Sequence, residues 1–104
     1  MFARASTIVG SREKVAEAVS ILESQVLPQI KQLDGFSGVL GLIDRETGKS
    51  LVITLWETQE ALRASEEAAT KVRAEAAKEL GSAGTPAVDR YEVVLQEVRT
   101  TVHA

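Results

Sequence analysis

The chain has 104 residues, with 44% hydrophobic and 26% charged side chains, which is typical of one soluble globular domain with a single core. A formal net charge of −3 argues against nucleic acid and anionic membranes as partners, and the absence of cysteine excludes disulfides, zinc–thiolate sites and thiol nucleophiles. No apolar run reaches the roughly 18 residues of a membrane span and the N-terminus lacks a signal-peptide core, so we expect one cytoplasmic domain over residues 1–104.

Residues 2–9 are predicted to form the first strand, because the β-branched residues near its end favour extended structure. Alternation along this strand places Phe2, Arg4, Ser6 and Ile8 on one face. Arg4 either directs a positive charge into a cleft or lies on a solvated edge of the sheet. The edge is the simpler interpretation.

A helix is predicted to follow Ser11, with one apolar stripe formed by Val15, Val19, Leu22 and Val26. Pro28 cannot occupy a helix interior without removing a hydrogen bond, so we predict a break or kink near Leu27. A short turn should then end at Asp34-Gly35.

Two apolar runs, residues 36–43 and 51–56, are predicted to form a hairpin, and Asp44–Lys49 connects them. Gly48 is placed to adopt the left-handed conformation, and Thr58 is placed to cap the next helix. On the second strand, the pattern predicts Phe36, Leu40 and Leu42 on one face and Val39 and Ile43 on the other. On the third strand, Leu51, Ile53 and Leu55 should lie opposite Val52, Thr54 and Trp56.

The second helix is predicted from Gln59 to Leu80 and should stop at Gly81. Its buried stripe consists mostly of small residues: Ala61, Ser65, Ala68, Ala69, Val72, Ala76 and Leu80. Glu66 and Glu67 should lie on its solvated face. A loop over 82–86 then leads to a last strand from about Val88 to Val98, which the pattern allows to continue to Val102.

The predicted order of elements is therefore β-α-β-β-α-β, in which right-handed crossovers place both helices on one face of the sheet. The strands are nevertheless apolar on both faces, and no segment is left to cover the second face. Because exposed patches of that size are rare on soluble monomers, we predict a homodimer in which two sheets pack face to face.

Three short segments carry a resemblance to a known family: Gly35-Phe36-Ser37-Gly38, the Asp44–Lys49 turn, and Leu55-Trp56-Glu57-Thr58 through Glu60-Ala61-Leu62. In these the chain resembles the antibiotic-biosynthesis-monooxygenase-like branch of the dimeric α+β barrel superfamily. The resemblance implies an α+β, ferredoxin-like unit with a four-stranded antiparallel sheet that dimerises through its sheets. Activities known in this family are cofactor-free oxygenation of phenolic polyketides, quinol oxidation and haem degradation.

The resemblance places Trp56 where the family has a strand-ending tryptophan, beside the cleft between helices and sheet. Haem-degrading members also have an asparagine on the first strand and a histidine on the second helix. This chain has neither, and the histidine position falls near Glu75. We therefore expect no haem, no metal and no other cofactor.

Each candidate site residue also has a structural interpretation. Trp56 and Tyr91 are the predicted catalytic residues, which would orient and polarise an aromatic ligand, although packing at a strand end would explain both. Phe36, Arg4 and Ser65 are the predicted ligand contacts, although Phe36 also suits a core position. His103 is the only imidazole, but it lies at the chain end, where an acid–base group is poorly held.

Two classes of function remain open. One is a cofactor-independent monooxygenase that acts on a small phenolic or quinol substrate in the cleft between helices and sheet. The other is a non-catalytic homodimer that binds a small apolar molecule or serves as an interaction module. An open cleft faced by a buried polar group would favour the enzyme, whereas a cleft filled by Phe36, Trp56 and leucines would favour the module.

Overall fold

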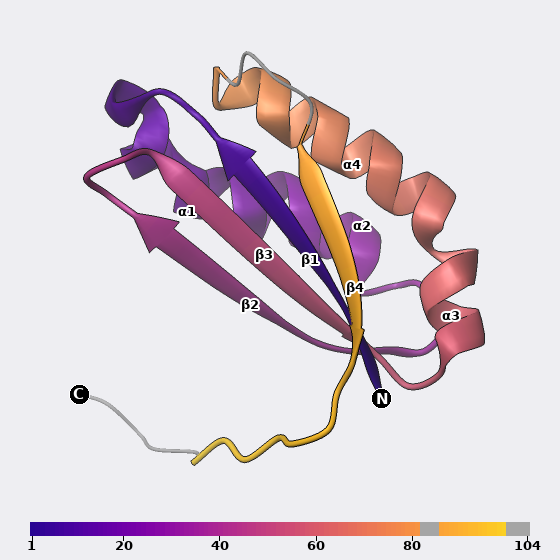
Figure 1. The fold of residues 1–104 in the computed structure, drawn as a ribbon. Coiled ribbons are helices and arrows are strands. Elements are labelled where there is room, and N and C mark those ends of the chain that lie inside the picture. The colour runs from indigo at the N-terminus through magenta and orange to yellow at the C-terminus, as the bar shows by residue number, and fades with distance from the viewer. Residues whose placement is uncertain (82–85, 100–104) are drawn as a thin grey trace.

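The computed structural model describes residues 1–81 and 86–99. Four antiparallel strands form one sheet in the order β2-β3-β1-β4. Their bounds are β1 Phe2–Val9, β2 Phe36–Asp44, β3 Lys49–Trp56 and β4 Ala87–Glu92. The helices gather on one face of this sheet (Figure 1). The predicted ferredoxin-like α+β fold is therefore confirmed.

The strand registers decide which side chains face the helices. Arg4 of β1 lies opposite Thr54 of β3 and Arg90 of β4, so all three share the helix-covered face, which we call the inner face. Tyr91 lies opposite Ala3 on the other side of the sheet, which we call the outer face.

The predicted faces of β2 are wrong, because the strand has a bulge between Phe36 and Gly38. The extra residue reverses the alternation, so Phe36 joins Val39 and Ile43 on the inner face, while Leu40 and Leu42 point outward. The predicted alternation of β3 is confirmed, because Ser50, Val52, Thr54 and Trp56 are buried whereas Leu51, Ile53 and Leu55 are only partly so.

The first helical stretch contains four consecutive segments of three kinds. They are the 3-10 helix η1 Arg12–Glu17, α1 Ala18–Ile21, the π-helical η2 Leu22–Val26 and α2 Leu27–Ile30. The wide turn lets the Leu27 N–H donate to the Leu22 carbonyl, and Pro28, which has no N–H, lies in the first turn of α2. The irregularity predicted near Leu27 is thus a π turn that keeps the chain helical.

The predicted apolar stripe of the first helix is confirmed at Leu22 and Val26, which pack in the core, but not at Val19. The buried residues of the stretch are Ala18, Ile21, Val26 and Ile30, whereas Val19 is 43% exposed. The side chain of Val15 lies outside the described part of the structure. A period of 3.6 residues does not apply across a 3-10 turn and a π turn.

The second helical stretch is divided at Ser65 into α3 Gln59–Ala64 and α4 Glu66–Glu79. It was predicted as one helix from Gln59 to Leu80. The Thr58 cap is confirmed, because its hydroxyl accepts a bond from the Ala61 N–H at 3.0 Å. Gly81 has a φ of +71° directly after the helix, as the predicted stop requires.

The hairpin turn between β2 and β3 forms as predicted. Gly48 has a φ of +80°, and the Asp44 carboxylate accepts bonds from the N–H groups of Glu46 and Thr47. These bonds hold the pKa of Asp44 below its usual value.

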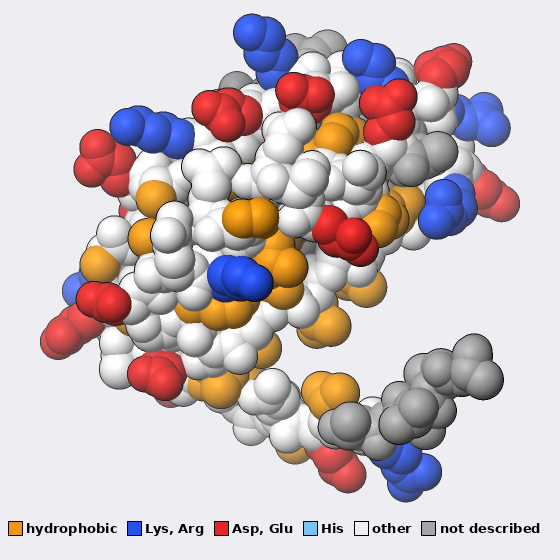
Figure 2. All heavy atoms as spheres, turned by 180° about the vertical axis from the view of Figure 1, so that it is seen from behind, with side chains coloured by type: hydrophobic (Ala, Val, Ile, Leu, Met, Phe, Trp, Pro, Cys, Tyr) orange, Lys and Arg blue, Asp and Glu red, His pale blue; other side chains and the backbone are white. Residues whose placement is uncertain are grey.

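Between the helices and the inner face lies the hydrophobic core, which includes Ile8, Ile21, Ile30, Trp56, Leu62, Val72 and Leu80. Hydrophobic side chains also show between the charged ones on the reverse side of the molecule (Figure 2). On the outer face, Leu40 and Leu42 are 50% and 47% exposed, and no described element covers them.

The last strand ends earlier than predicted, at Glu92 instead of Val98. Its partner β1 begins at Phe2, which lies opposite Glu92, so only the bond from the Val93 N–H to the Met1 carbonyl extends the pairing. Val94, Leu95 and Val98 are therefore highly exposed. The predicted continuation to Val102 lies outside the described residues. In the described part of the chain, none of the helices is long and apolar enough to cross a membrane.

Candidate functional site

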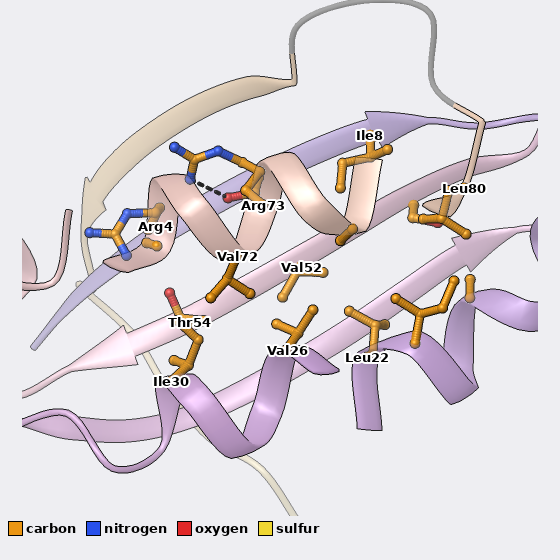
Figure 3. Close-up of a pocket in the computed structure, with 16 residues that line it drawn as sticks. Arg4, Ile8, Leu22, Val26, Ile30, Val52, Thr54, Val72, Arg73 and Leu80 are labelled. Atoms are coloured by element: carbon orange, nitrogen blue, oxygen red, sulfur yellow. Dashed lines mark hydrogen bonds between the residues drawn. The ribbon is translucent and has the colours of Figure 1, made fainter. Parts of the chain in front are cut away.

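Two adjoining cavities lie between the helices and the inner face of the sheet. Their volumes are about 40 Å³ and about 240 Å³, and Leu22, Val26, Ile30, Val52 and Thr54 line both. The smaller one reaches β1 and α4, where its lining includes Arg4 and Arg73 (Figure 3). The larger one extends toward β2. Together they form an apolar space with charged groups at one end.

A glycine on β2 keeps the larger cavity open. Gly41 lies on the inner face opposite Val52, and a Cβ atom at this position would meet the Leu22 Cδ1 atom at 3.1 Å. Any larger side chain there would fill the space between β2 and the π turn. Gly41 therefore determines how much of this cavity a ligand can use.

Arg4 is the buried charged residue at the other cavity and is only 2% exposed. Its Nη2 atom donates to the Leu62 carbonyl and the Ser65 Oγ atom, both at 2.8 Å, and lies 3.1 Å from the Glu66 carboxylate. Its Nε and Nη1 atoms have no hydrogen-bond partner among the described residues. Arg4 thus lies in the cleft, and the alternative of a solvated edge is wrong.

Trp56 is fully buried behind Arg4 and does not line either cavity. Its indole N–H donates to the Thr54 hydroxyl at 3.0 Å. The Phe36 ring meets it edge-on with 5.8 Å between centroids, and the Arg4 guanidinium carbon lies 5.7 Å from its ring centre. The indole therefore supports the Arg4 cation from one side.

The predicted site residues are only partly brought together. Arg4, Ser65, Trp56 and Phe36 form one connected group beside the cavities. Tyr91 lies on the outer side of the edge strand β4 and is 57% exposed, and it forms no hydrogen bond with this group of described residues but borders a surface cavity of about 570 Å³ with Glu66 and Arg90. His103 lies outside the described residues.

Glu66 is the carboxylate of this region, and it does not belong to a purely solvated helix face as predicted. It accepts bonds from the Nε atom of Arg90 at 2.5 Å and from Nη2 at 2.8 Å, in addition to its ion pair with Arg4. The Arg90 bonds, assisted by Arg4 and opposed by partial burial, lower the pKa of Glu66 to about 2. The same contact raises the pKa of Arg90.

Arg73 of α4 adds a further positive charge. Its Nη1 atom donates to the Ser6 hydroxyl at 3.3 Å (Figure 3). Burial, and then the positive charge of Arg4, lower its pKa. Figure 3 shows Arg4 and the Arg73 guanidinium at one end of the cavity, with Ile8 and Leu80 at the other.

Three residues of this site were not identified from the sequence: Arg73, Glu66 and Arg90. One signal was available, since Arg73 directly follows Val72 and lies four residues after Ala69 on the buried stripe of α4. No spacing in the sequence could have indicated Arg90, because its contact with Glu66 depends on how β4 lies against α4. Among the described residues, no group of three or more histidine, aspartate or glutamate side chains is arranged to hold a metal ion.

Comparison of the sequence with known proteins finds uncharacterised relatives. No family model matches the chain. Two Mycobacterium tuberculosis (strain H37Rv) proteins are similar: Rv2557 is 36% identical over 93 residues, 89% of this chain and 41% of that protein, and Rv2558 is 34% identical over 95 residues, 91% of this chain and 39% of that protein. Both are uncharacterised. The chain thus spans about two fifths of the length of the curated relatives it matches.

Comparison of the structure finds several solved proteins with this fold. A monooxygenase from the gene ActVA-Orf6 of Streptomyces coelicolor, in complex with nanaomycin D, has a TM-score of 0.74 and 14% identity, with 95% of this chain and 92% of that chain covered. A variant of MhuD with two manganese protoporphyrin IX molecules per active site has a TM-score of 0.71 and 18% identity. The match covers 95% of this chain and 100% of that chain.

A Deinococcus radiodurans protein assigned as an antibiotic biosynthesis monooxygenase has a TM-score of 0.70 and 20% identity, covering 97% of this chain and all of that one. These likenesses, at 20% identity or less, show that the chain shares the ferredoxin-like α+β fold of these solved proteins. The fold that the resemblance implied is confirmed.

Proposed function

We propose that this protein is a homodimeric, cofactor-independent monooxygenase that acts on a small phenolic or quinol substrate between the helices and the sheet. The observation that carries the proposal is a pair of adjoining apolar cavities, of about 240 Å³ and about 40 Å³, with a buried arginine, Arg4, at the end of the smaller one. Such an arrangement suits a flat apolar ring with one polar substituent. The nanaomycin D complex of a monooxygenase with the same fold adds support.

The reaction balances without an external reductant. A phenol that reacts as its keto tautomer carries two hydrogens on one ring carbon. That carbon gains one oxygen atom of O₂ as a carbonyl, and the second oxygen atom leaves as water with the two hydrogens. The substrate supplies all the electrons, so the protein has to bind the ring, exclude bulk water and favour the electron-rich phenolate.

Different residues of the cavity have different roles in this reaction. The aliphatic side chains shared by both cavities position the ring, and the Arg4 cation lowers the free energy of a phenolate oxygen nearby. Trp56 acts as a positioning residue, since its ring lies against the Arg4 guanidinium. The predicted catalytic role of Tyr91 stays a prediction, and this scheme does not require it.

Haem chemistry does not fit the residues present. Neither histidine nor cysteine, the usual axial ligands of haem iron, occurs among the residues that line the two cavities. The only tyrosine in the chain lies on the outer face. Haem is therefore not part of the proposed reaction.

A non-catalytic binding module is the second candidate. It is favoured by the indole N–H of Trp56, which already donates to Thr54 and is not directed at a ligand. In that case the cavity would bind the same class of ring without turnover.

Oxygen incorporation tests the proposal. Purified protein is incubated with simple naphthols, anthrones and hydroquinones under ¹⁸O₂, and the product mass is read against protein-free autoxidation. We expect one ¹⁸O atom per product ring and a rate above background that Gly41→Val lowers at least about tenfold, because it fills the larger cavity.

The control is Ala64→Val, since Ala64 is exposed at the end of α3 and lines neither cavity. This variant should keep the wild-type rate. Binding of the same compounds without any rate above background would leave the binding module as the function. No saturable binding of any of them would contradict both candidates.

A further inference from the structure

The charges at the polar end of the smaller cavity do not balance. The guanidinium groups of Arg4 and Arg90 share one carboxylate, that of Glu66, and Arg73 adds a third positive charge. Asp89 also attracts Arg90, but it lies on the outer face of β4. Among the described side chains in contact in this cluster, three cations thus face one anion; Glu92, on the same face of β4, has no ion pair with them.

The unused donors of Arg4 lie at the centre of this surplus. A guanidinium has five N–H donors, and those on Nη2 serve Leu62, Ser65 and Glu66. The donors on Nε and Nη1 are buried without a partner among the described residues. Buried donors on a charged group cost stability unless they are paired. The unpaired N–H groups of Arg4 therefore call for an explanation, such as a ligand that accepts from them.

Anchoring of the helix explains only part of this arrangement. The Nη2 atom ties β1 to the junction of α3 and α4, and the Trp56 ring supports the plane of the guanidinium. Neither contact uses Nε or Nη1 of Arg4. Arg73 is not needed for the anchor at all, since it bonds to Ser6 and Thr70 instead.

We propose that the cavity recognises an anionic oxygen group on an aromatic ligand, a carboxylate or an ionised phenol, through Arg4 and Arg73. The anion accepts from the unpartnered N–H groups of Arg4 and lies within the field of Arg73, while the ring occupies the apolar space toward Val26 and Val52. This inference rests on the binding site of the proposed function but not on the oxygenation step. It names the ligand class as aromatic acids.

Calorimetry with matched probes tests the inference. We would titrate 2-naphthoate, its neutral amide 2-naphthamide, and a hydroxynaphthoquinone that is ionised at pH 7 into the wild-type protein. Because a hydrogen bond to a charged group outweighs a neutral one, we expect naphthoate to bind at least about tenfold more tightly than the amide. The ionised naphthoquinone then shows whether a phenolate-type oxygen is accepted as well as a carboxylate.

Arg73→Gln is the informative variant, because Arg73 is only partly buried and its loss should leave the fold intact. It should reduce the preference for naphthoate over naphthamide to about threefold or less without changing amide binding. Arg45→Gln removes one positive charge from the exposed hairpin turn and should keep the preference. Gly41→Val should weaken both probes, which places them in the cavity.

The possible outcomes separate the two proposals. Equal binding of naphthoate and naphthamide, or a preference that Arg73→Gln leaves unchanged, would overturn the anion inference while the oxygenase proposal stands. A preference that depends on Arg73, without any ¹⁸O incorporation, would support the inference and refute the oxygenase. Failure of every probe to bind would refute the anion inference, while ¹⁸O incorporation into the naphthols and anthrones still decides the oxygenase.

Discussion

At the scale of single residues, Trp56 connects the core of the protein with the candidate site. Its ring is fully buried, its N–H donates to Thr54, and one side of it supports the Arg4 guanidinium. A change at Trp56 should therefore affect stability first and ligand binding through Arg4 second.

Trp56→Phe should lower the free energy of unfolding by about 1–3 kcal/mol, because it leaves a cavity and deprives the Thr54 hydroxyl of its donor. Urea unfolding followed by far-UV circular dichroism measures the loss. Thr54→Val is the matched control for the hydrogen bond alone and should cost about 1–2 kcal/mol. A Trp56→Phe variant with an unchanged free energy of unfolding would show that the indole does not pack as described.

Glu66 gives the protein a pH dependence whose sign follows from its lowered pKa. The folded-state pKa of about 2 lies below the ordinary glutamate value of 4.5, so the ionised carboxylate stabilises the fold above pH 4.5. This contribution is lost as the pH falls from 4.5 through about 2. Because Glu66 is partly exposed, we expect its ionised carboxylate to contribute roughly 1–2 kcal/mol to the free energy of unfolding.

Urea unfolding at pH 7, 4.5 and 2.5 tests this dependence. Glu66→Gln should be less stable than wild type at pH 7, and the difference should shrink at pH 2.5. Glu67→Gln is the control, since Glu67 is the exposed neighbour on the same helix. A constant difference across the three pH values would contradict the assigned ion pairs.

At the scale of secondary-structure elements, the features predicted correctly are those that depend on neighbouring residues. The Gly48 turn and the Thr58 cap each need only a few adjacent side chains, and both form as the sequence indicates. Val19 of the first-helix stripe and the faces of β2 were predicted wrongly, because a π turn and a bulge shift the phase of the pattern.

The candidate site divides in the same way. Arg4 and Ser65 were predicted as ligand contacts from residue type and resemblance, yet the 2.8 Å bond between them joins residues 61 positions apart. Whether such groups meet depends on how α4 docks on β1. Periodicity within one element does not report that docking, which is why Arg90 was not anticipated and why the position of Arg73 beside the buried stripe did not indicate its partners.

Ser65 is the residue at which the second helical stretch is divided, and its hydroxyl binds both Arg4 and the Leu62 carbonyl. Ser65→Ala should cost about 1–2 kcal/mol despite the better helix propensity of alanine, because a buried guanidinium loses an acceptor. Ser24→Ala removes an exposed hydroxyl bonded to the Ser20 carbonyl and should change stability by less than about 0.5 kcal/mol. Thermal or urea unfolding of both variants measures these losses. Equal losses of stability in the two variants would contradict a special role for Ser65.

At the scale of the whole molecule, the outer face of the sheet is the feature left unexplained by a single chain. Its centre consists of leucine and isoleucine side chains from β2 and β3, and the described residues provide no cover for it. The tail over residues 93–99 adds exposed Val94, Leu95 and Val98 beside the sheet. Apolar surface of this extent favours association, and a two-fold symmetric pair would bury the same face of both copies.

Leu40→Glu tests the proposed homodimer. We expect sedimentation equilibrium at micromolar concentration to give the mass of two chains for the wild type and of one chain for this variant. Leu40 is 50% exposed and lies opposite Ile53 on the outer face, so two-fold symmetry would place two carboxylates in the apolar interface, where unpaired charges are costly. Val19→Glu is the control, because Val19 is 43% exposed on the helical side and should not affect the mass. A wild-type mass of one chain would refute the dimer, and the leucines of the outer face would then need another partner.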